Sequence, residues 1–179
     1  MVRLAAVPVV LGAVVLAAGC GGDKSTSDTT SPSEWANGVC SAINTWTGSV
    51  KSAGESLKDS PSKDGLDSAA NDVKSATDTF VSDLKDLGKP DTKAGQQAKT
   101  SIDQLSSDVD KDVQDMQSAV DEASGVSGVL TAVSSVAATL ATMNNQVKST
   151  FSELEQLDPA GELDRAFQDA SACSSLTAS

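Results

Sequence analysis

Four long segments of this chain carry apolar residues at spacings of three and four, and this pattern constrains the fold more than any other feature. Such spacing places apolar side chains on one side of an α-helix, whereas a half-buried strand alternates with a period of two. No segment alternates in that way. The sequence therefore predicts an all-α fold without strands: an elongated antiparallel four-helix bundle with a short fifth C-terminal helix.

The predicted core consists of the apolar residues of these stripes. The first stripe contains Trp35, Val39, Ile43, Trp46, Val50, Ala53 and Leu57, and the second contains Leu66, Ala69, Val73, Ala76, Phe80, Leu84 and Leu87. The third contains Ala98, Ile102, Leu105, Val109, Val113, Met116, Val120 and Ala123. The fourth contains Val129, Val133, Val136, Leu140, Met143, Val147, Phe151, Leu154 and Leu157, and the short fifth helix carries Leu163, Ala166, Phe167, Ala170 and Cys173.

Capping and turn residues divide the chain between the stripes. Ser31-Pro32-Ser33-Glu34 combines an N-cap serine, a proline at the first helical position and a glutamate at the third, so a helix is predicted to begin there. Gly88 and Pro90 supply a C-cap and a stop, and Asp91 is predicted to cap the third helix. Further breaks are predicted at Pro61, Gly65, Gly125 and Gly128. Asp158-Pro159 repeats the cap-plus-proline start, so the short fifth helix is predicted to begin there.

The N-terminus has the parts of a secretory signal. Arg3 precedes an apolar stretch from Leu4 to Val15, and Leu16-Ala17-Ala18-Gly19-Cys20 follows. A basic residue, a short apolar region and small residues before the cleavage site define such a signal. The apolar run is about 15 residues long where about 20 are needed to span a bilayer, so cleavage is predicted in place of a retained helix. No later segment is expected to be apolar enough to span.

A cysteine directly after Ala-Ala-Gly resembles the lipobox of bacterial lipoproteins, although Ala17 stands where leucine is commonest. The resemblance implies a mature chain that begins at Cys20, carries a diacylglycerol anchor with acyl chains such as palmitate, and is held on the extracytoplasmic face of the cell membrane. The expected organisation is a signal peptide over 1–19, the lipidated Cys20 and a flexible tether over 20–31, and the bundle domain over 32–179.

Lipidation of Cys20 leaves Cys40 and Cys173 as a pair in an oxidising compartment, where disulfides form. In the predicted topology the first helix and the short fifth helix place both cysteines in the same half of the bundle. We therefore predict a disulfide between them. The alternative is two separate buried thiols that pack as small apolar groups.

Both ends of the bundle domain are similar to a group of small actinobacterial helical lipoproteins. The similarity is carried by the segment from Glu34 to Cys40 with Trp46, and by the segment from Leu157 to Leu163 with Ala166-Phe167 and Cys173. The group has no defined activity. The resemblance therefore implies the fold and a cysteine pair, and it implies no mechanism.

Composition excludes several classes of function. The formal net charge is −12, so the surface repels phosphate backbones, and no nucleic-acid partner is expected. The chain contains no histidine, which removes histidine-based catalytic triads, general bases and metal ligands. No cofactor is expected.

Two short motifs resemble functional sequences only in part. Asp108-x-Asp110-x-Asp112 copies the start of a calcium loop, but Val113 and Ala119 occupy positions six and twelve, where glycine and glutamate are required. A solvated acidic helix face is predicted there, with weak divalent-ion binding as the alternative.

The spelling S-x-x-K occurs at Ser60 with Lys63 and at Ser82 with Lys85, without the partner motifs of that chemistry. No catalytic residue and no metal site are predicted, and the protein is not expected to be an enzyme. A hydrolase would require a convergent polar site.

These observations lead to two functional hypotheses. The first is a membrane-anchored, non-enzymatic scaffold or interaction module that presents a face of its bundle to an unknown protein partner in the cell envelope. The alternative is a carrier or sensor that holds an apolar ligand between its helices.

Overall fold

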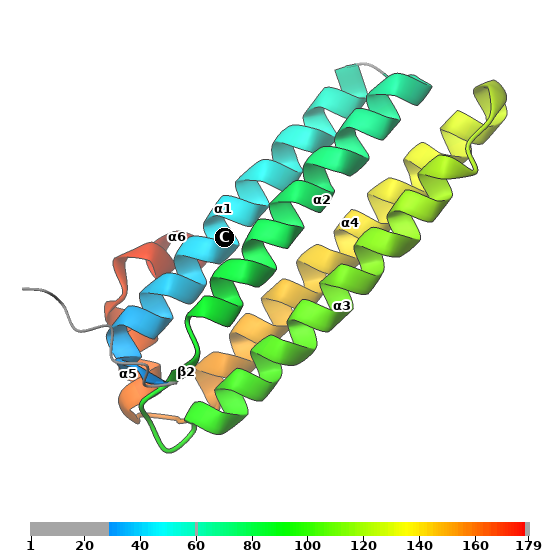
Figure 1. Ribbon diagram of the computed structural model, residues 1–179. Coiled ribbons are helices and arrows are strands. Elements are labelled where there is room, and N and C mark those ends of the chain that lie inside the picture. Colours follow the sequence, from blue (N-terminus) through cyan, green and yellow to red (C-terminus); the bar gives the residue numbers. More distant parts are fainter. Residues whose placement is uncertain (1–28, 60, 178–179) are drawn as a thin grey trace, which may run out of the picture.

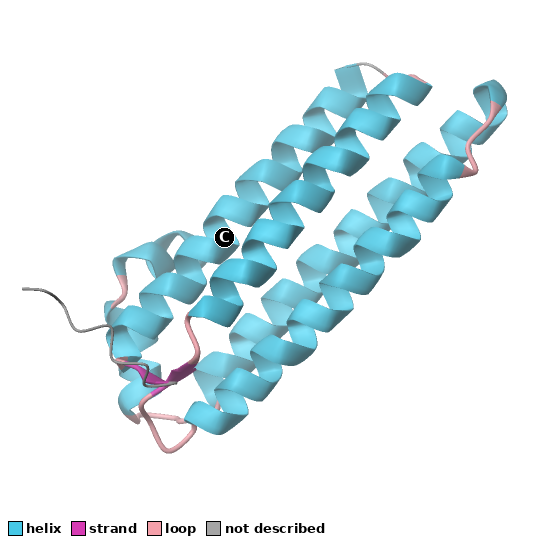
Figure 2. Cartoon of the chain, in the orientation of Figure 1, coloured by secondary structure: helices cyan, strands magenta, loops and turns pink. Residues whose placement is uncertain are grey.

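The computed structural model describes residues 29–59 and 61–177, and these residues form a bundle of long helices (Figure 1). Helices and loops account for nearly all of the described chain (Figure 2). The long helices are α1 (Pro32–Asp59), α2 (Lys63–Asp86), α3 (Gly95–Asp121) and α4 (Gly125–Gln156). The short elements are β1 (Thr29–Thr30), β2 (Lys89–Pro90), α5 (Glu162–Asp169), the 3-10 helix η1 (Ser171–Cys173) and α6 (Ser174–Thr177).

The predicted all-α fold is confirmed. Short connections make successive long helices antiparallel, and α1 packs mainly on α2, α2 on α3 and α3 on α4. The ring of four helices is least closed between α1 and α4, which pack on each other only weakly. With 28 residues and a rise of 1.5 Å per residue, α1 alone is about 42 Å long, so the domain is a rod.

The predicted apolar stripes form the core. Every residue of the third stripe is buried, and Trp35 and Trp46 are only 1% and 2% exposed. The fourth stripe is buried from Met143 to Leu154, but its beginning is only partly covered, because Val129 and Val133 are half-buried. The α4 helix is therefore the least enclosed of the four long helices at its N-terminal end.

Local capping explains several helix ends. Ser31 Oγ accepts a hydrogen bond from the Glu34 backbone N–H at 3.4 Å and donates to the Glu34 carboxylate at 2.6 Å, which agrees with the predicted start of α1. Ser62, which we did not predict as a cap, accepts from the Gly65 N–H at the start of α2. Gly88 has the left-handed φ of 62° that was expected after α2.

The predicted cap at Asp91 is wrong. The α3 helix begins at Gly95, and its N-cap, Ala94, makes no side-chain capping bond. The Asp91 backbone N–H instead donates to the Thr30 carbonyl at 2.8 Å. A tight turn follows, in which the position of a Cβ on Gly95 lies 2.0 Å from the Pro90 carbonyl oxygen, so this turn requires glycine.

The prediction of no strand is wrong at one place. Thr29 and Thr30 pair in parallel with Lys89 and Pro90, so the last residues of the expected tether lie against the α2–α3 connection. The Thr30 hydroxyl donates to the Leu87 carbonyl, and the Trp35 indole N–H donates to the Gly88 carbonyl at 3.2 Å. These contacts join segments that are more than 50 residues apart in the sequence, so the spacing of apolar residues within one helix does not predict them.

The predicted fifth helix is broken. The α5 helix ends at Asp169, Ala170 adopts an extended backbone with ψ of 116°, and Cys173 lies in η1. The start also differs, since α5 begins at Glu162 after the N-cap Gly161, although Asp158 still accepts from the Leu163 N–H at 3.4 Å. The break turns the chain toward α1, where Ala172 bonds to Asn37 and Asn44 and Cys173 bonds to Cys40.

Candidate functional site

The N-terminal end of α1 and the C-terminal helix α5 lie at the same end of the bundle. The β1–β2 pair and α5 lie at this end, and the α1–α2 and α3–α4 connections lie at the other (Figure 1). The predicted signal peptide, the lipidation site at Cys20 and residues 20–28 of the tether lie outside the described residues. We call the end that holds β1 and α5 the entry end, and the end formed by residues 61–63 and 121–130 the far tip.

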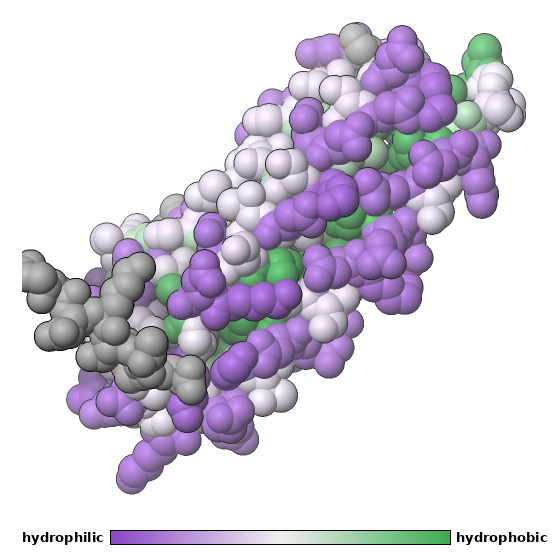
Figure 3. All heavy atoms as spheres, in the orientation of Figure 1, coloured by the Kyte–Doolittle hydropathy of each residue, from purple (hydrophilic) through white to green (hydrophobic). Residues whose placement is uncertain are grey.

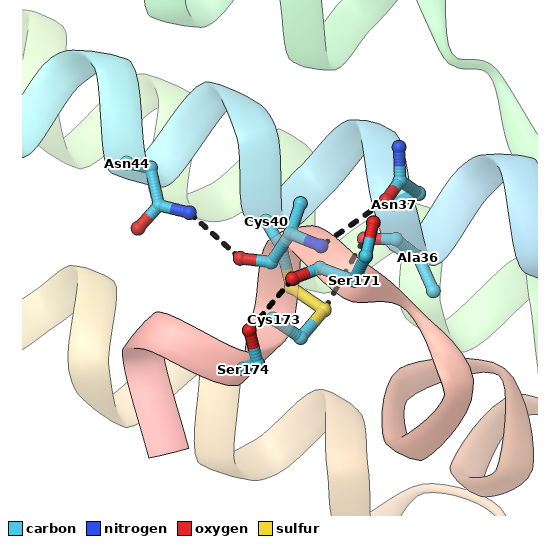
Figure 4. The surroundings of a disulfide bond; sticks show 8 residues. Ala36, Asn37, Cys40, Asn44, Ser171, Cys173 and Ser174 are labelled. Carbon is cyan, nitrogen blue, oxygen red and sulfur yellow. Dashed lines mark hydrogen bonds between the residues drawn. A yellow bond between two sulfur atoms is a disulfide. The ribbon is translucent and has the colours of Figure 1, made fainter. Parts of the chain in front are cut away.

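A disulfide between Cys40 and Cys173 fastens the C-terminal segment to α1, as predicted, with 5.0 Å between the Cα atoms (Figure 4). Both cysteines are buried. Asn37 Oδ1 accepts from the Ala172 N–H at 3.3 Å, and the Asn44 side-chain amide donates to the Ala172 carbonyl at 2.7 Å. These two asparagines satisfy the backbone where the fifth helix is broken, and they hold η1 along α1.

Phe167 of α5 lies between α1 and α4 at the entry end. Its ring is 5.9 Å from that of Trp35 on α1 and 5.5 Å from that of Phe151 on α4, in edge-to-face geometry on both sides. Edge-to-face aromatic pairs are favourable because the positive ring edge meets the negative face. The C-terminal segment therefore fills the seam between α1 and α4 at this end and holds these two helices apart.

A groove of about 610 Å³ follows this seam. It is bounded by α1, α4 and α6, and its lining residues are Ile43, Thr47, Asn144, Val147, Lys148, Phe151, Ser152, Glu155 and Leu176. The large side chains Ile43, Val147 and Phe151 are almost fully buried and form its floor, and Leu176 is half-buried. The carrier hypothesis placed an apolar ligand between helices, but the apolar spacing predicted Ile43, Val147 and Phe151 only as core residues.

The far tip exposes large apolar side chains. Val126 and Leu130 at the start of α4 are 80% and 60% exposed. They line a groove of about 480 Å³ with Pro61 and Ala123, among other residues of the two tip connections. In the space-filling view, hydrophobic atoms lie at the end of the α3–α4 hairpin (Figure 3). The apolar spacing did not identify either residue, because both lie off the core stripe.

The tip continues into an uncharged helix surface. From Ala123 to Val147 the sequence contains no charged residue.

 In the part of the chain that the structure describes, α4 is the one helix long and apolar enough to cross a membrane by length and composition. The expectation that no later segment meets that criterion is therefore wrong. Core helices of bundles meet it too, and Val136, Met143 and Val147 of α4 are buried in this bundle.

The acidic residues of α3 have separate surroundings. Asp108 accepts from the Gln104 side chain at 2.9 Å, and Asp115 pairs with Lys111 at 2.6 Å. Among residues 29–59 and 61–177, no group of three or more acidic or cysteine side chains could hold a metal ion. Ser82 and Lys85 are exposed, and Ser60 lies outside the described residues.

Two carboxyl groups have pKa values above the ordinary value for their residue type. Burial is the main cause that raises the pKa of Asp112, and the nearby Asp115 and Asp108 raise it further, while the Gln146 side chain and Lys111 act in the opposite direction. Burial also raises the pKa of Glu155 in the α1–α4 groove, with a further contribution from Asp164. Both groups therefore favour the neutral form more than a free carboxyl does.

Comparison of the chain with protein families, with curated proteins and with solved structures finds no match. The similarity of the two ends of the bundle domain to small actinobacterial helical lipoproteins stays a prediction from the sequence.

Proposed function

We propose that the protein is a non-enzymatic, membrane-anchored lipoprotein of the cell envelope that presents the far tip of a helical rod to a protein partner. The observation that carries this proposal is the exposure of Val126 and Leu130 at the end of the bundle opposite the chain's entry. Large apolar side chains exposed together commonly mark sites of interaction.

The sequence supports the orientation of the rod. A lipid on Cys20 would hold the entry end close to the membrane, because Thr30 is paired with Pro90 at that end. The far tip would then project away from the membrane by about the length of α1, roughly 42 Å. A rod anchored in this way carries its exposed apolar residues out to a partner in the envelope.

The chemistry of the tip indicates the kind of surface it recognises. Val126 and Leu130 would bury apolar area against an apolar patch of the partner, and the uncharged start of α4 allows close approach without desolvation of ions. The rest of the chain is strongly acidic, so the other surfaces of the rod would repel an acidic partner.

Affinity capture of the intact lipoprotein from its own membranes tests the proposal. A Val126→Asp, Leu130→Asp variant should lose a protein that the parent retains. The matched control, Ser107→Asp with Ser118→Asp, adds the same charge to exposed positions on α3 and should retain that protein. Equal retention of the same proteins by the parent and the tip variant would refute the role of the tip.

The groove between α1 and α4 favours a second candidate function, the carrier or sensor of an apolar ligand. Its volume of about 610 Å³ lies within the range of about 300–1,000 Å³ that is common for ligand sites. The support for this candidate is independent of the far tip.

A further inference from the structure

We infer that the groove between α1, α4 and α6 binds the acyl chain of a single-chain amphiphile, and that Lys148 holds its anionic head. The inference rests on the second candidate function and gives it a site and a class of ligand. It does not depend on the far tip, so the two proposals can fail separately.

The first support is the way the seam is held open. Phe167 separates Trp35 from Phe151 at the entry end, and the disulfide fixes the segment that carries α6 against α1. Phe167 therefore keeps α1 and α4 apart at this end, and the disulfide holds the C-terminal segment in place on α1. A groove defined in this way is preformed, which lowers the cost of ordering on binding.

The second support is the lining. Ile43, Val147 and Phe151 present an apolar floor, and Leu176 covers one side. The larger groove between α1 and α2, of about 650 Å³, is lined by Asp72 and Asp83 and by no basic residue, whereas Lys148 lines the α1–α4 groove. Burial of the acyl chain on the apolar floor is favourable by about 25 cal/mol per Å². The two carboxylates of the α1–α2 groove would repel an anionic head, which favours the α1–α4 groove for this ligand.

The third support is the charge at the rim. Five lysines pair with an acidic residue four positions later: Lys51, Lys63, Lys74, Lys99 and Lys111. Lys148 has Ser152 at that position, and the ion pairs found among the described residues do not include Lys148. It is the single basic residue of α4, so an anionic head would find there a cation without a competing carboxylate four positions later.

The other charged residue of the groove is compatible with this arrangement. Glu155 lies seven residues after Lys148, which is about 10 Å along the helix. Burial raises the pKa of Glu155, so its neutral form costs less than that of a free carboxyl. The spacing of the two residues along α4 keeps the head at Lys148 away from this carboxyl group.

Fluorescence titration with cis-parinaric acid tests the inference on the mature chain with Cys20→Ser, which keeps every described residue. The parent should bind the probe saturably. Lys148→Glu and Thr47→Trp should each weaken binding at least tenfold, the first by reversing the charge and the second by filling the groove from an exposed position. Lys58→Glu, the same charge change near the end of α1, should bind like the parent.

Competition then separates the possible sources of the ligand. Displacement by oleate alone indicates a free fatty acid, and displacement by lysophosphatidylglycerol alone indicates a membrane-derived lipid; either result supports the site. Oleyl alcohol, which lacks the charge, should compete at least tenfold more weakly than oleate. The inference is overturned if the probe does not bind saturably, or if Lys148→Glu and Thr47→Trp both bind it like the parent.

Discussion

The indole N–H of Trp46 on α1 donates a hydrogen bond to the hydroxyl of Thr77 on α2, with 3.1 Å between Nε1 and Oγ1. Both residues are buried, and the Trp46 ring lies 5.5 Å from that of Phe80. The hydrogen bond satisfies a polar group that would otherwise be unpaired in the core. It also fixes the relative position of α1 and α2, because each partner lies on a different helix.

Thr77→Val should therefore destabilise the protein, although valine has nearly the same shape as threonine. An unpaired buried donor costs about 1–3 kcal/mol. Chemical denaturation should show this loss in Thr77→Val. Adding Trp46→Phe removes the unpaired donor, so the two changes should be less than additive in a double-mutant cycle. Strict additivity would contradict a coupled pair.

Cys20→Ser should block lipidation and processing, because the thiol accepts the diacylglycerol. In detergent phase partitioning, the parent should enter the detergent phase and the variant the aqueous phase. Cys173→Ser, which removes a cysteine away from the signal, serves as the control and should still partition with detergent. Unchanged partitioning of Cys20→Ser would show that the lipobox interpretation is wrong.

The Cys40–Cys173 bond closes a loop with a sequence separation of 133 residues. Loss of a native disulfide from a small secreted domain typically costs about 2–5 kcal/mol. A variant with serine at both positions should melt at a lower temperature than the parent. Mass measurement of the unreduced mature chain should show two hydrogens fewer than the reduced chain, and free thiols at both positions would contradict the bond.

Asp112→Asn should stabilise the protein at neutral pH. The folded-state pKa of Asp112 is raised above its ordinary value, so its ionisation at neutral pH opposes folding. That penalty is complete above the folded-state pKa and disappears as the pH falls below the unfolded-state pKa. Denaturation should show a gain of less than about 1 kcal/mol near pH 7, since the group is partly solvated, and no gain in acid.

A triple variant tests the acidic face as a whole. Replacement of Asp108, Asp110 and Asp112 with asparagine should leave the protein folded, because like-charge repulsion is relieved. Micromolar calcium binding by the parent that is lost in this variant would contradict a solvated acidic face.

Two glycines should respond in opposite directions to alanine. Gly48 lies inside α1 with open space around its Cβ position, so Gly48→Ala should stabilise by up to about 1 kcal/mol through helix propensity. A Cβ on Gly95 would lie 2.0 Å from the Pro90 carbonyl oxygen, so Gly95→Ala should destabilise by about 1–3 kcal/mol or more. Thermal melts of both variants check the prediction, and equal shifts would refute it.

The sequence by itself determined the elements whose causes are local. The spacing of apolar residues predicted the four long helices, Ser31 and Glu34 predicted the start of α1, and Gly88 predicted the end of α2. The cysteine pair followed from counting residues and from helix direction. These features depend on neighbours within a few turns or on simple topology, so they can be deduced from the order of residues.

Tertiary structure alone decided where distant segments meet. Asp91 lies in the connection that bonds to Thr30, and α3 begins only at Gly95. The fifth helix breaks at Ala170, and Asn37 and Asn44 bind the backbone of Ala172 beyond the break. The two grooves and the exposure of Val126 and Leu130 likewise depend on which surfaces neighbouring helices cover. Apolar periodicity identifies the side of a helix that can be buried, but only packing determines whether another element covers it.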